Sequence, residues 1–393
     1  MEGQRASRLP DWVVAPAGML ITTTIIGSFL AFNVFLKYLL DDFDWSRGGT
    51  AAALSVAMMA QGVLSPVTGS LADKYGARLL VSVGAALLGV GYLLLSQIQE
   101  LWQLYALYLL TGVGGATVFV PVVGAVSRRF HQRRGLALGV GVSGITLGTA
   151  IVPLSLSWVI SMLGWRQTYI LVAVVIGVLV LSLGQLMGGR PAVTRGRRPG
   201  GHSLLQAVRT PTFWKILLAS GVSLSAVHMV VAHLVTFSTD QGLAAAKGAT
   251  LVSLMGISGF GGMIVTGYVA DRIGGRVPWV ISALLSTTAL LWIITMRDPA
   301  MIYPFVVVYG FAWGGYAVLV PFLAAEFFGI RSVAALIGGV QLGAAVMASS
   351  GPIASGFVFD RTGSYYPAFG MGIALFIIGA ALVSWMRKVP ETK

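Results

Sequence analysis

Two histidines interrupt an apolar stretch, residues 213–237, in a chain of 393 residues. Histidine is the side chain that exchanges protons near neutrality, because its unperturbed pKa is about 6.5. His228 and His233 are therefore candidates for proton transfer, although a buried histidine can also be a hydrogen-bonded packing residue. They are five positions apart, so on a helix they point about 140° away from one another. We expect only one of the two to face a central pathway.

Isolated amides and aromatic residues complete the candidate pathway. A buried amide needs a hydrogen-bond partner, so each single amide in an apolar stretch either lines a pathway or joins neighbouring helices. The amides are Asn33, Gln61 and Gln341. Aromatic residues recur in two corresponding stretches, where they could form a wall of the pathway or belong to an interfacial belt. These are Tyr105, Tyr108, Tyr309, Trp313 and Tyr316.

A charged ten-residue phrase occurs twice, as GSLADKYGAR at 69–78 and as GYVADRIGGR at 267–276. An aspartate at the face of a membrane is costly unless it is paired. We therefore expect each aspartate to accept hydrogen bonds from the arginine of its own copy or from the positive N-terminus of a neighbouring helix. Such contacts would cross between helices and break when that side of the molecule opens. We interpret the charged residues as a conformational latch: Asp73, Arg78, Asp271 and Arg276.

The stretches that hold these residues are long, apolar and poor in charge. Hydrophobic residues make up 56% of the chain and charged residues 10%, with a mean hydropathy of +0.85, whereas a soluble domain carries about 25% charged residues. A helix needs about 20 apolar residues to cross a bilayer. Twelve stretches qualify, near 13–40, 49–72, 79–97, 101–127, 135–160, 167–188, 213–237, 246–270, 277–296, 300–323, 333–359 and 366–386. We expect an integral membrane protein.

The basic residues are distributed unevenly over the segments between these spans. If the N-terminal segment is inside, most of the 26 Lys and Arg residues fall in inside segments. The positive-inside rule then places both termini in the cytoplasm, and we expect a multi-pass protein of the cell (inner) membrane. The formal charge of +13 is explained by this topology. We therefore expect no nucleic-acid partner.

The twelve spans divide into two related sets of six. The only long polar stretch between spans is rich in Gly, Pro and Arg, which is typical of a linker. The repeated phrase follows the second and the eighth span, and GGATVFVP at 114–121 matches GGYAVLVP at 314–321, with offsets of 198 to 200 positions. We expect an all-α membrane protein with two pseudo-symmetric six-helix bundles. Their expected limits are 1–188 and 213–393, joined by a cytoplasmic linker at 189–212.

At the repeated phrase the chain resembles the major facilitator superfamily of secondary transporters. The phrase matches that superfamily's pattern Gly-x-Leu-Ala-Asp-Arg/Lys-x-Gly-x-Arg/Lys between the second and third spans, and here it is present in both halves. The resemblance implies transport by alternating access, with a substrate site between the two halves near the midplane of the bilayer.

Four shorter stretches resemble the monocarboxylate transporter family and its bacterial relatives. They are FNVFLKYLLDDFDWSRGG, SRRFHQRRGLALGVGVSG, HLVTFSTDQG and FDRTGSYYPAF. The resemblance implies proton-coupled uptake of a small monocarboxylate or a related organic acid, and it favours His233 over His228. The chain departs from the family in the eighth span, where many members carry an arginine that pairs with the substrate carboxylate. The corresponding stretch 253–271 has Met263 near that position and no basic residue.

The scarcity of charge within the spans limits the substrate. A desolvated carboxylate needs a compensating cation, because an isolated charge in a medium of low dielectric constant costs many kcal/mol. Apart from Lys37, Lys215 and Glu326 near span ends, no ionised residue lies well inside a span. A monoanion or a neutral organic compound therefore fits better than a dianion. Proton-antiport efflux of lipophilic or drug-like compounds is the alternative function.

Other classes of function lack their motifs in this chain. It has no cysteine, no zinc-binding His-Glu-x-x-His, no Gly-x-Ser-x-Gly elbow and no phosphate-binding loop. We therefore predict no enzymatic activity, no metal and no cofactor. A channel is disfavoured because a two-fold internal repeat suits two halves that move against one another. The expected partners are a small organic substrate, protons and membrane lipids, and we expect a monomer.

Overall fold

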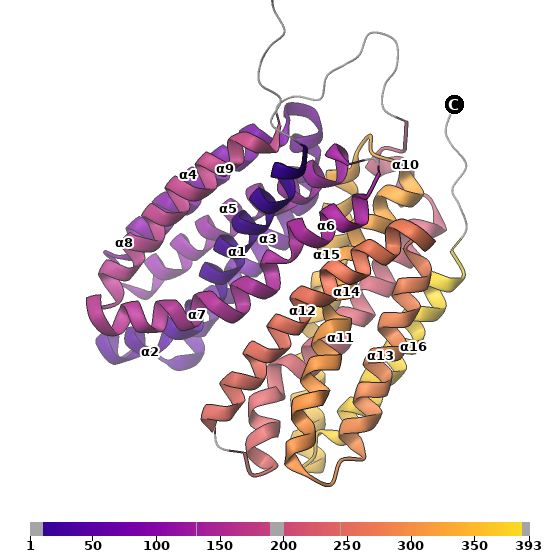
Figure 1. The fold of residues 1–393 in the computed structure, drawn as a ribbon. Helices are drawn as coiled ribbons and strands as arrows, with labels where there is room; N and C mark the ends of the chain where they lie inside the picture. Colours follow the sequence, from indigo (N-terminus) through magenta and orange to yellow (C-terminus); the bar gives the residue numbers. More distant parts are fainter. Residues whose placement is uncertain (1–10, 131, 189–199, 244, 387–393) are drawn as a thin grey trace, which may run out of the picture.

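The computed structural model describes residues 11–130, 132–188, 200–243 and 245–386. Within those residues, twelve helices are long and apolar enough to cross a membrane. They form two bundles that lie side by side (Figure 1). The predicted all-α fold of twelve spans is therefore confirmed, with span ends that differ from the prediction by a few residues. The first span, for example, is Asp11–Phe43 where 13–40 was expected.

The first bundle contains the spans up to Met187. Its first span is interrupted at Ala31, its fifth at Ser143, and its sixth contains a short π-helical segment. The helices are α1 (Val14–Leu30), α2 (Phe32–Phe43), α3 (Arg47–Tyr75), α4 (Ala77–Leu95), α5 (Leu101–Arg129), α6 (Arg134–Val142), α7 (Gly144–Leu163), α8 (Trp165–Val175) and α9 (Leu181–Gly184).

The second bundle begins after the linker and uses one continuous helix for each span. A short helix, α10, precedes it. The helices are α10 (Leu204–Val208), α11 (Pro211–Asp240), α12 (Ala245–Ile273), α13 (Arg276–Ile294), α14 (Ile302–Phe328), α15 (Val333–Thr362) and α16 (Tyr366–Ser384). The expected start of this bundle at residue 213 lies two residues inside α11, because Thr210 caps the helix and Pro211 occupies its first turn.

The second glycine of each repeated phrase ends a helix and reverses the chain. Gly76 follows α3 with φ of 97°, and Gly274 follows α12 with φ of 79°. Residues with a side chain rarely adopt this left-handed region, whereas glycine does so at little cost. The phrase therefore marks the same tight turn, between two long helices, in both bundles.

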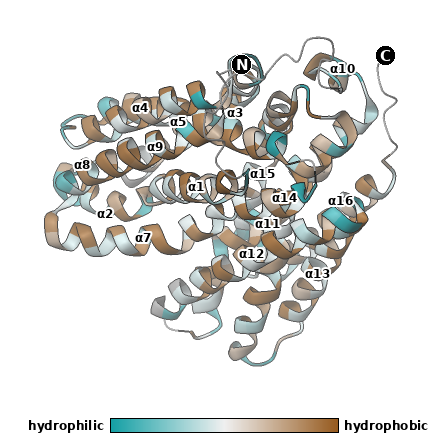
Figure 2. Ribbon diagram, turned by 45° about the horizontal axis from the view of Figure 1, so that its top comes forward, coloured by the Kyte–Doolittle hydropathy of each residue, from teal (hydrophilic) through white to brown (hydrophobic). Residues whose placement is uncertain are grey.

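Apolar side chains cover much of the outer surface of both bundles. Brown, hydrophobic residues predominate along the helices in Figure 2. Large examples are Trp158, which is 66% exposed, and Ile353, which is 73% exposed. A soluble protein would bury such side chains, whereas a bilayer offers an apolar surrounding to helices whose backbone groups are bonded internally. The surface thus agrees with a multi-pass membrane protein.

The two bundles meet at one end of the molecule and diverge toward the other (Figure 1). We call the end where α10 lies the linker end. Residues 189–199 of the expected linker lie outside the described residues. The remainder is attached to the second bundle, because Gly201 forms an isolated antiparallel bridge with Gly329 and the His202 N–H donates to the Phe328 carbonyl at 2.8 Å. The proposed limits of the two bundles stay a prediction.

Candidate functional site

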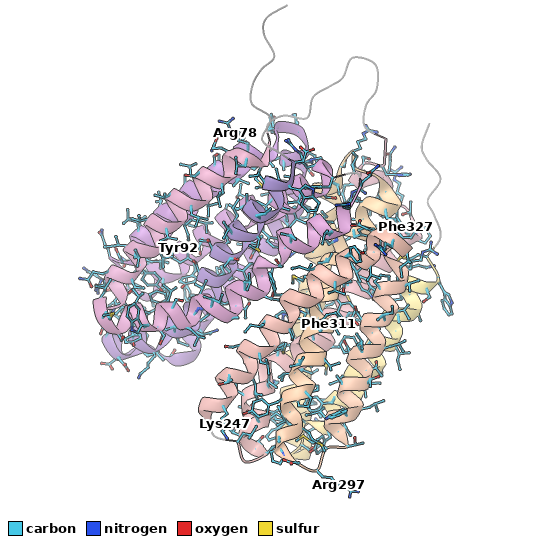
Figure 3. All side chains as sticks on the ribbon, viewed as in Figure 1. Arg78, Tyr92, Lys247, Arg297, Phe311 and Phe327 are labelled. Atoms are coloured by element: carbon cyan, nitrogen blue, oxygen red, sulfur yellow. The ribbon has the colours of Figure 1, made fainter. Side chains whose placement is uncertain are left out.

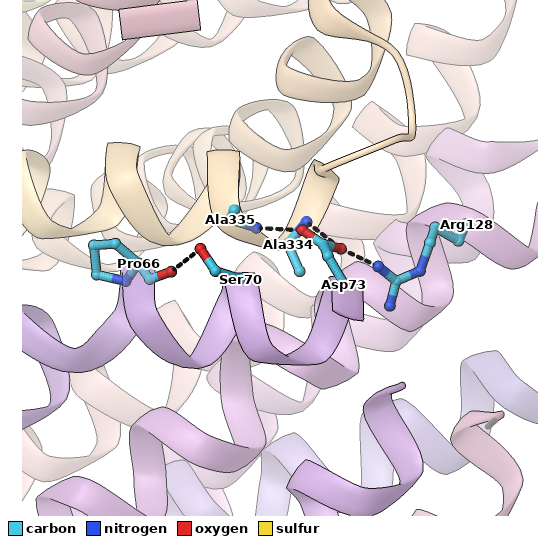
Figure 4. Close-up of polar contacts among 6 residues, drawn as sticks. All are labelled: Pro66, Ser70, Asp73, Arg128, Ala334 and Ala335. Atoms are coloured by element: carbon cyan, nitrogen blue, oxygen red, sulfur yellow. Dashed lines mark hydrogen bonds and ion pairs between the residues drawn. The ribbon is translucent and has the colours of Figure 1, made fainter. Parts of the chain in front are cut away.

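Asp73 of the first bundle caps a helix of the second bundle. Its carboxylate accepts the backbone N–H groups of Ala334, at 3.3 Å, and Ala335, at 2.9 Å, in the first turn of α15. It also pairs with the Arg128 guanidinium at the end of α5 (Figure 4). We call this arrangement the first capping contact. The first turn of a helix has free N–H groups and a partial positive charge, so a carboxylate is stabilised there.

Asp271 makes the corresponding contact in the opposite direction. Its carboxylate lies at the end of α12 and accepts the N–H groups of Gly135, at 2.6 Å, and Leu136, at 2.8 Å, in the first turn of α6. We call this the second capping contact. Each bundle thus caps a helix of its partner bundle, and the four N–H bonds of the two contacts join the bundles directly.

Close backbone approaches surround both capping contacts. A Cβ added to Gly69 would overlap the Ala334 carbonyl oxygen of α15. Gly135 and Gly267 face one another, so that a Cβ on either would overlap the carbonyl oxygen of the other. Small residues let helix backbones come this near. The bundles are therefore held together at the linker end by backbone fit as well as by the aspartates.

The arginines that we expected to pair with the aspartates make other contacts. The Nε atom of Arg78 donates to the Gln185 Oε1 atom of the same bundle at 2.5 Å, and Arg78 lies at the linker end (Figure 3). Arg276 lies over the Phe327 ring, 5.0 Å from its centroid. The aspartates thus use the second expected partner, a helix N-terminus. The sequence did not identify Arg128 as a partner of Asp73. The available signal was that Arg128 ends the fourth span on the same expected side of the membrane as the repeated phrase.

His233 joins three elements of the second bundle. Its Nε2 atom lies 3.2 Å from the Pro352 carbonyl oxygen in α15, and its Nδ1 atom lies 3.3 Å from the Tyr365 hydroxyl before α16. The same hydroxyl lies 3.4 Å from the Thr236 Oγ1 atom. A carbonyl only accepts, so Nε2 carries the proton and Nδ1 of the neutral ring accepts from Tyr365. The Tyr365 ring also packs tilted against the imidazole, with centroids 5.1 Å apart.

The other predicted polar residues lie apart from His233. The Nδ1 atom of His228 bonds the Leu224 carbonyl of its own helix at 2.8 Å. Gln61 lies beside Gly115 of α5, Asn33 is exposed on α2, and Gln341 is half-buried on α15. The structure does not gather these side chains into one cluster.

The aromatic residues mostly pack inside their own bundles. Tyr108 is 1% exposed and its hydroxyl lies 3.3 Å from that of Tyr169, while the Tyr105 hydroxyl donates to the Gly49 carbonyl at 2.7 Å. Tyr309 is fully buried and donates to the Ala226 carbonyl at 3.1 Å. Tyr316 is 1% exposed and stacks on Phe376. Trp313 is half-buried. Tyr309 and Tyr316, which could have formed a wall of the pathway or part of an interfacial belt, thus lie in the interior of the second bundle.

This architecture agrees with known proteins. The model of the Major Facilitator Superfamily matches residues 18–335, and the chain belongs to that family. Human monocarboxylate transporter 11 is 28% identical over 97% of this chain and 84% of its own length. Monocarboxylate transporter 13 of Bos taurus is 26% identical over 95% and 88%. The fungal MFS transporter asaE of Aspergillus flavus is 26% identical over 85% and 76%.

Solved structures of low sequence identity share the fold. The human organic anion transporter MFSD10 has a TM-score of 0.74 and 14% identity, covering 95% of this chain and 100% of that one. The transporter FucP in the outward conformation has a TM-score of 0.76 and 13% identity, covering 96% and 99%. The family match and the named relatives make the chain a multi-pass membrane transporter related to the monocarboxylate transporters, and not an enzyme. These monocarboxylate transporters are animal proteins and asaE is fungal, so the expected likeness to bacterial relatives is not borne out.

Proposed function

We propose that this transporter takes up a small monocarboxylate, or a related organic acid, together with a proton. Its linker end would face the cytoplasm. The proposal combines three supports: the names of the relatives, the low charge of the spans and the surroundings of His233.

The capping contacts define the conformational step. Both aspartates tie one bundle to a helix N-terminus of the other bundle at the linker end. When that end opens, the hydrogen bonds from the four N–H groups to the two carboxylates must break, and the opposite end closes. Alternating access then becomes a rocking of the two bundles around a site between them. The arrangement described above is the state with the linker end closed.

The contacts of His233 carry the proton-coupling part of the proposal. Its Nδ1 atom can take a proton without losing a partner, because the Tyr365 hydroxyl can turn from donor to acceptor and donate instead to Thr236, which is exposed. The charged ring would then donate to both Tyr365 and Pro352, on two different elements. A proton taken up here therefore reverses the hydrogen bond to Tyr365 and gives the existing bond from Nε2 to Pro352 of α15 a charged donor, which strengthens it. Asp73 caps this same helix α15.

The substrate class follows from charge. One proton on His233 compensates one carboxylate, so the coupled step moves a neutral pair into a region that holds little other charge. A dianion would leave one charge without a partner, which is costly in a medium of low dielectric constant. A monocarboxylate is therefore favoured.

Uptake into proteoliposomes with an imposed pH gradient tests the proposal. The panel contains labelled lactate-like acids, larger aryl acids and neutral solutes. The outer pH is lowered from about 7.5 to about 5.5, within the range in which histidine side chains commonly exchange protons. We expect acid uptake to rise as the outer pH falls, and the rise to disappear in His233→Gln.

His228→Gln serves as the matched comparison, because His228 bonds only to its own helix in the described residues. It should keep the acid stimulation. Tyr365→Phe should weaken the stimulation, since it removes the hydroxyl partner of Nδ1. Acid stimulation that survives in His233→Gln would contradict the role of this histidine, and extrusion of lipophilic dyes without acid uptake would favour the efflux alternative.

A further inference from the structure

A pocket of about 730 Å³ lies at the linker end, where the first bundle meets the second. It includes the second capping contact but extends beyond it. Its charged side chains and its exposed tyrosine come from α6 and the residue before it, from α12 and from α14. They are Arg133, Arg134, Tyr268, Asp271, Arg272 and Glu326.

The acidic groups of this pocket are already engaged. Asp271 accepts two N–H groups of α6. Glu326 accepts the Gly275 N–H at 3.1 Å. Each carboxylate therefore has bonded donors, and neither requires a further cation from outside.

The basic groups retain most of their donors. Arg134 uses its Nε atom on the Phe130 carbonyl at 3.1 Å, and Arg272 lies over the Tyr268 ring, 4.5 Å from its centroid. Arg133 precedes α6 in a left-handed conformation with φ of 60°. Within the described residues, none of these three guanidinium groups forms an ion pair. Guanidinium groups with free donors match the oxygens of a phosphate ester in geometry and charge.

The charge balance indicates which anion fits. Three guanidinium groups and two carboxylates leave one net positive charge, so a singly charged phosphodiester neutralises the pocket and a doubly charged anion does not. We propose that this pocket binds a phosphate-ester anion, with the headgroup of an anionic lipid as its principal source.

The outer edge of the pocket supports a lipid source. On α12, Val265 is 46% exposed and Tyr268 is 44% exposed, at helical spacing before Arg272. This face is apolar up to the arginine, as expected for a surface that touches acyl chains below a headgroup. A lipid lying along α12 can therefore place its phosphate at Arg272 without leaving the bilayer.

Bound there, the phosphate would join the two bundles. Arg133 and Arg134 belong to the first bundle and Arg272 to the second. A ligand that contacts both bundles only when the linker end is closed stabilises that state by its binding free energy. The lipid would thus shift the conformational equilibrium whatever substrate is carried.

Spin-label distances in nanodiscs provide the test. The chain has no cysteine, so Leu79→Cys and Leu205→Cys, which are exposed positions on the two sides of the linker end, give one label pair. We compare discs of phosphatidylcholine with discs that also contain phosphatidylglycerol, a monoanionic phosphodiester. Phosphatidylglycerol should raise the ratio of closed to open linker end by about fivefold or more, the lower range of ordinary coupling between sites.

Arginine variants decide whether the pocket is responsible. Arg133→Gln with Arg272→Gln should abolish the increase, whereas Arg209→Gln with Arg331→Gln, which removes two exposed arginines of the same end outside the pocket, should keep it. Thermal unfolding in phosphatidylcholine discs checks that both variants fold. Inorganic phosphate added to phosphatidylcholine discs is the second arm, and an equal increase there would assign the site to soluble phosphate. No increase in either arm, or equal loss in both variants, would overturn the proposal.

Discussion

The two capping contacts occupy equivalent places in the internal repeat, but they are built differently. In the first contact, Asp73 pairs with Arg128 of its own bundle, and the two side chains are 9% and 19% exposed. The second contact has no such ion pair in the described residues. Its hydrogen bonds are shorter, at 2.6 and 2.8 Å, than the 3.3 and 2.9 Å of the first.

The difference extends to the backbone. At the first contact, Gly69 faces Ala334, which has a side chain, whereas at the second contact Gly267 faces Gly135. Both contacts thus include a close backbone approach, but the first also holds a neutralised charge, whereas in the second both facing residues are glycines. Equivalent positions in a duplicated fold can therefore hold the same end closed by different physical means. Removal of the aspartate's charge should therefore damage the first contact more than the second.

The largest expected effect is that of Asp73→Asn. It leaves the Arg128 guanidinium without its carboxylate in a mostly buried place, which costs about 3 kcal/mol of unfolding free energy. Thermal unfolding in detergent or nanodiscs measures it. Because the cost comes from the unpaired charge, adding Arg128→Gln should restore part of the lost stability. If the double variant is less stable than Asp73→Asn alone, the ion pair is not the main cause.

Gly267→Ala should have the next largest effect, on closing rather than on folding. A methyl group there would overlap the Gly135 carbonyl oxygen, and overpacking of this kind costs about 2 kcal/mol. The label pair at Leu79 and Leu205 should show a linker end that is mostly open. Gly177→Ala is the matched control, because Gly177 is helical and has open space around it. A closed linker end in Gly267→Ala would show that the backbones do not touch as described.

Much of the fold was predictable from the sequence, because the lengths of the apolar stretches and the internal repeat can be read directly from the residues. The turn glycines Gly76 and Gly274 were also predictable, since the phrase that holds them recurs at the same place in both halves. The sequence also indicated that both aspartates need partners, because an isolated charge at the face of a membrane is costly.

The partners themselves were harder to predict. Asp73 accepts hydrogen bonds from N–H groups more than 260 positions away. Every residue except proline has a backbone N–H, so the residue types did not indicate which ones Asp73 would bond. The arginines of the phrase were nearer in sequence but not in space. For His233, the Tyr365 hydroxyl lies 132 positions away, and packing of α11 against α15 and α16 brings the two together. Helical spacing also could not tell whether Tyr309 and Tyr316 face a pathway or the interior of a bundle.

Asp271→Asn should have a smaller effect than either variant above. The amide keeps one acceptor oxygen for the first turn of α6 but loses the negative charge that favours a helix N-terminus, which costs about 1 kcal/mol of closing free energy. This substitution leaves no arginine without an ion-pair partner, so the unfolding temperature should change little. The ratio of open to closed linker end should rise about fivefold. A loss of stability as large as that of Asp73→Asn would remove the distinction between the two contacts.

The smallest effect is expected from Ala334→Gly, which gives the first contact the glycine pair of the second. Ala334 is fully buried and its methyl group lies against Gly124 of α5. Its removal costs up to about 1 kcal/mol through lost packing and a more flexible first turn of α15. The reciprocal change, Gly135→Ala, introduces the same methyl group where the Gly267 carbonyl leaves no space, so it should shift the label distances several times more. Equal shifts from the two changes would mean that the added methyl group finds space between Gly135 and Gly267.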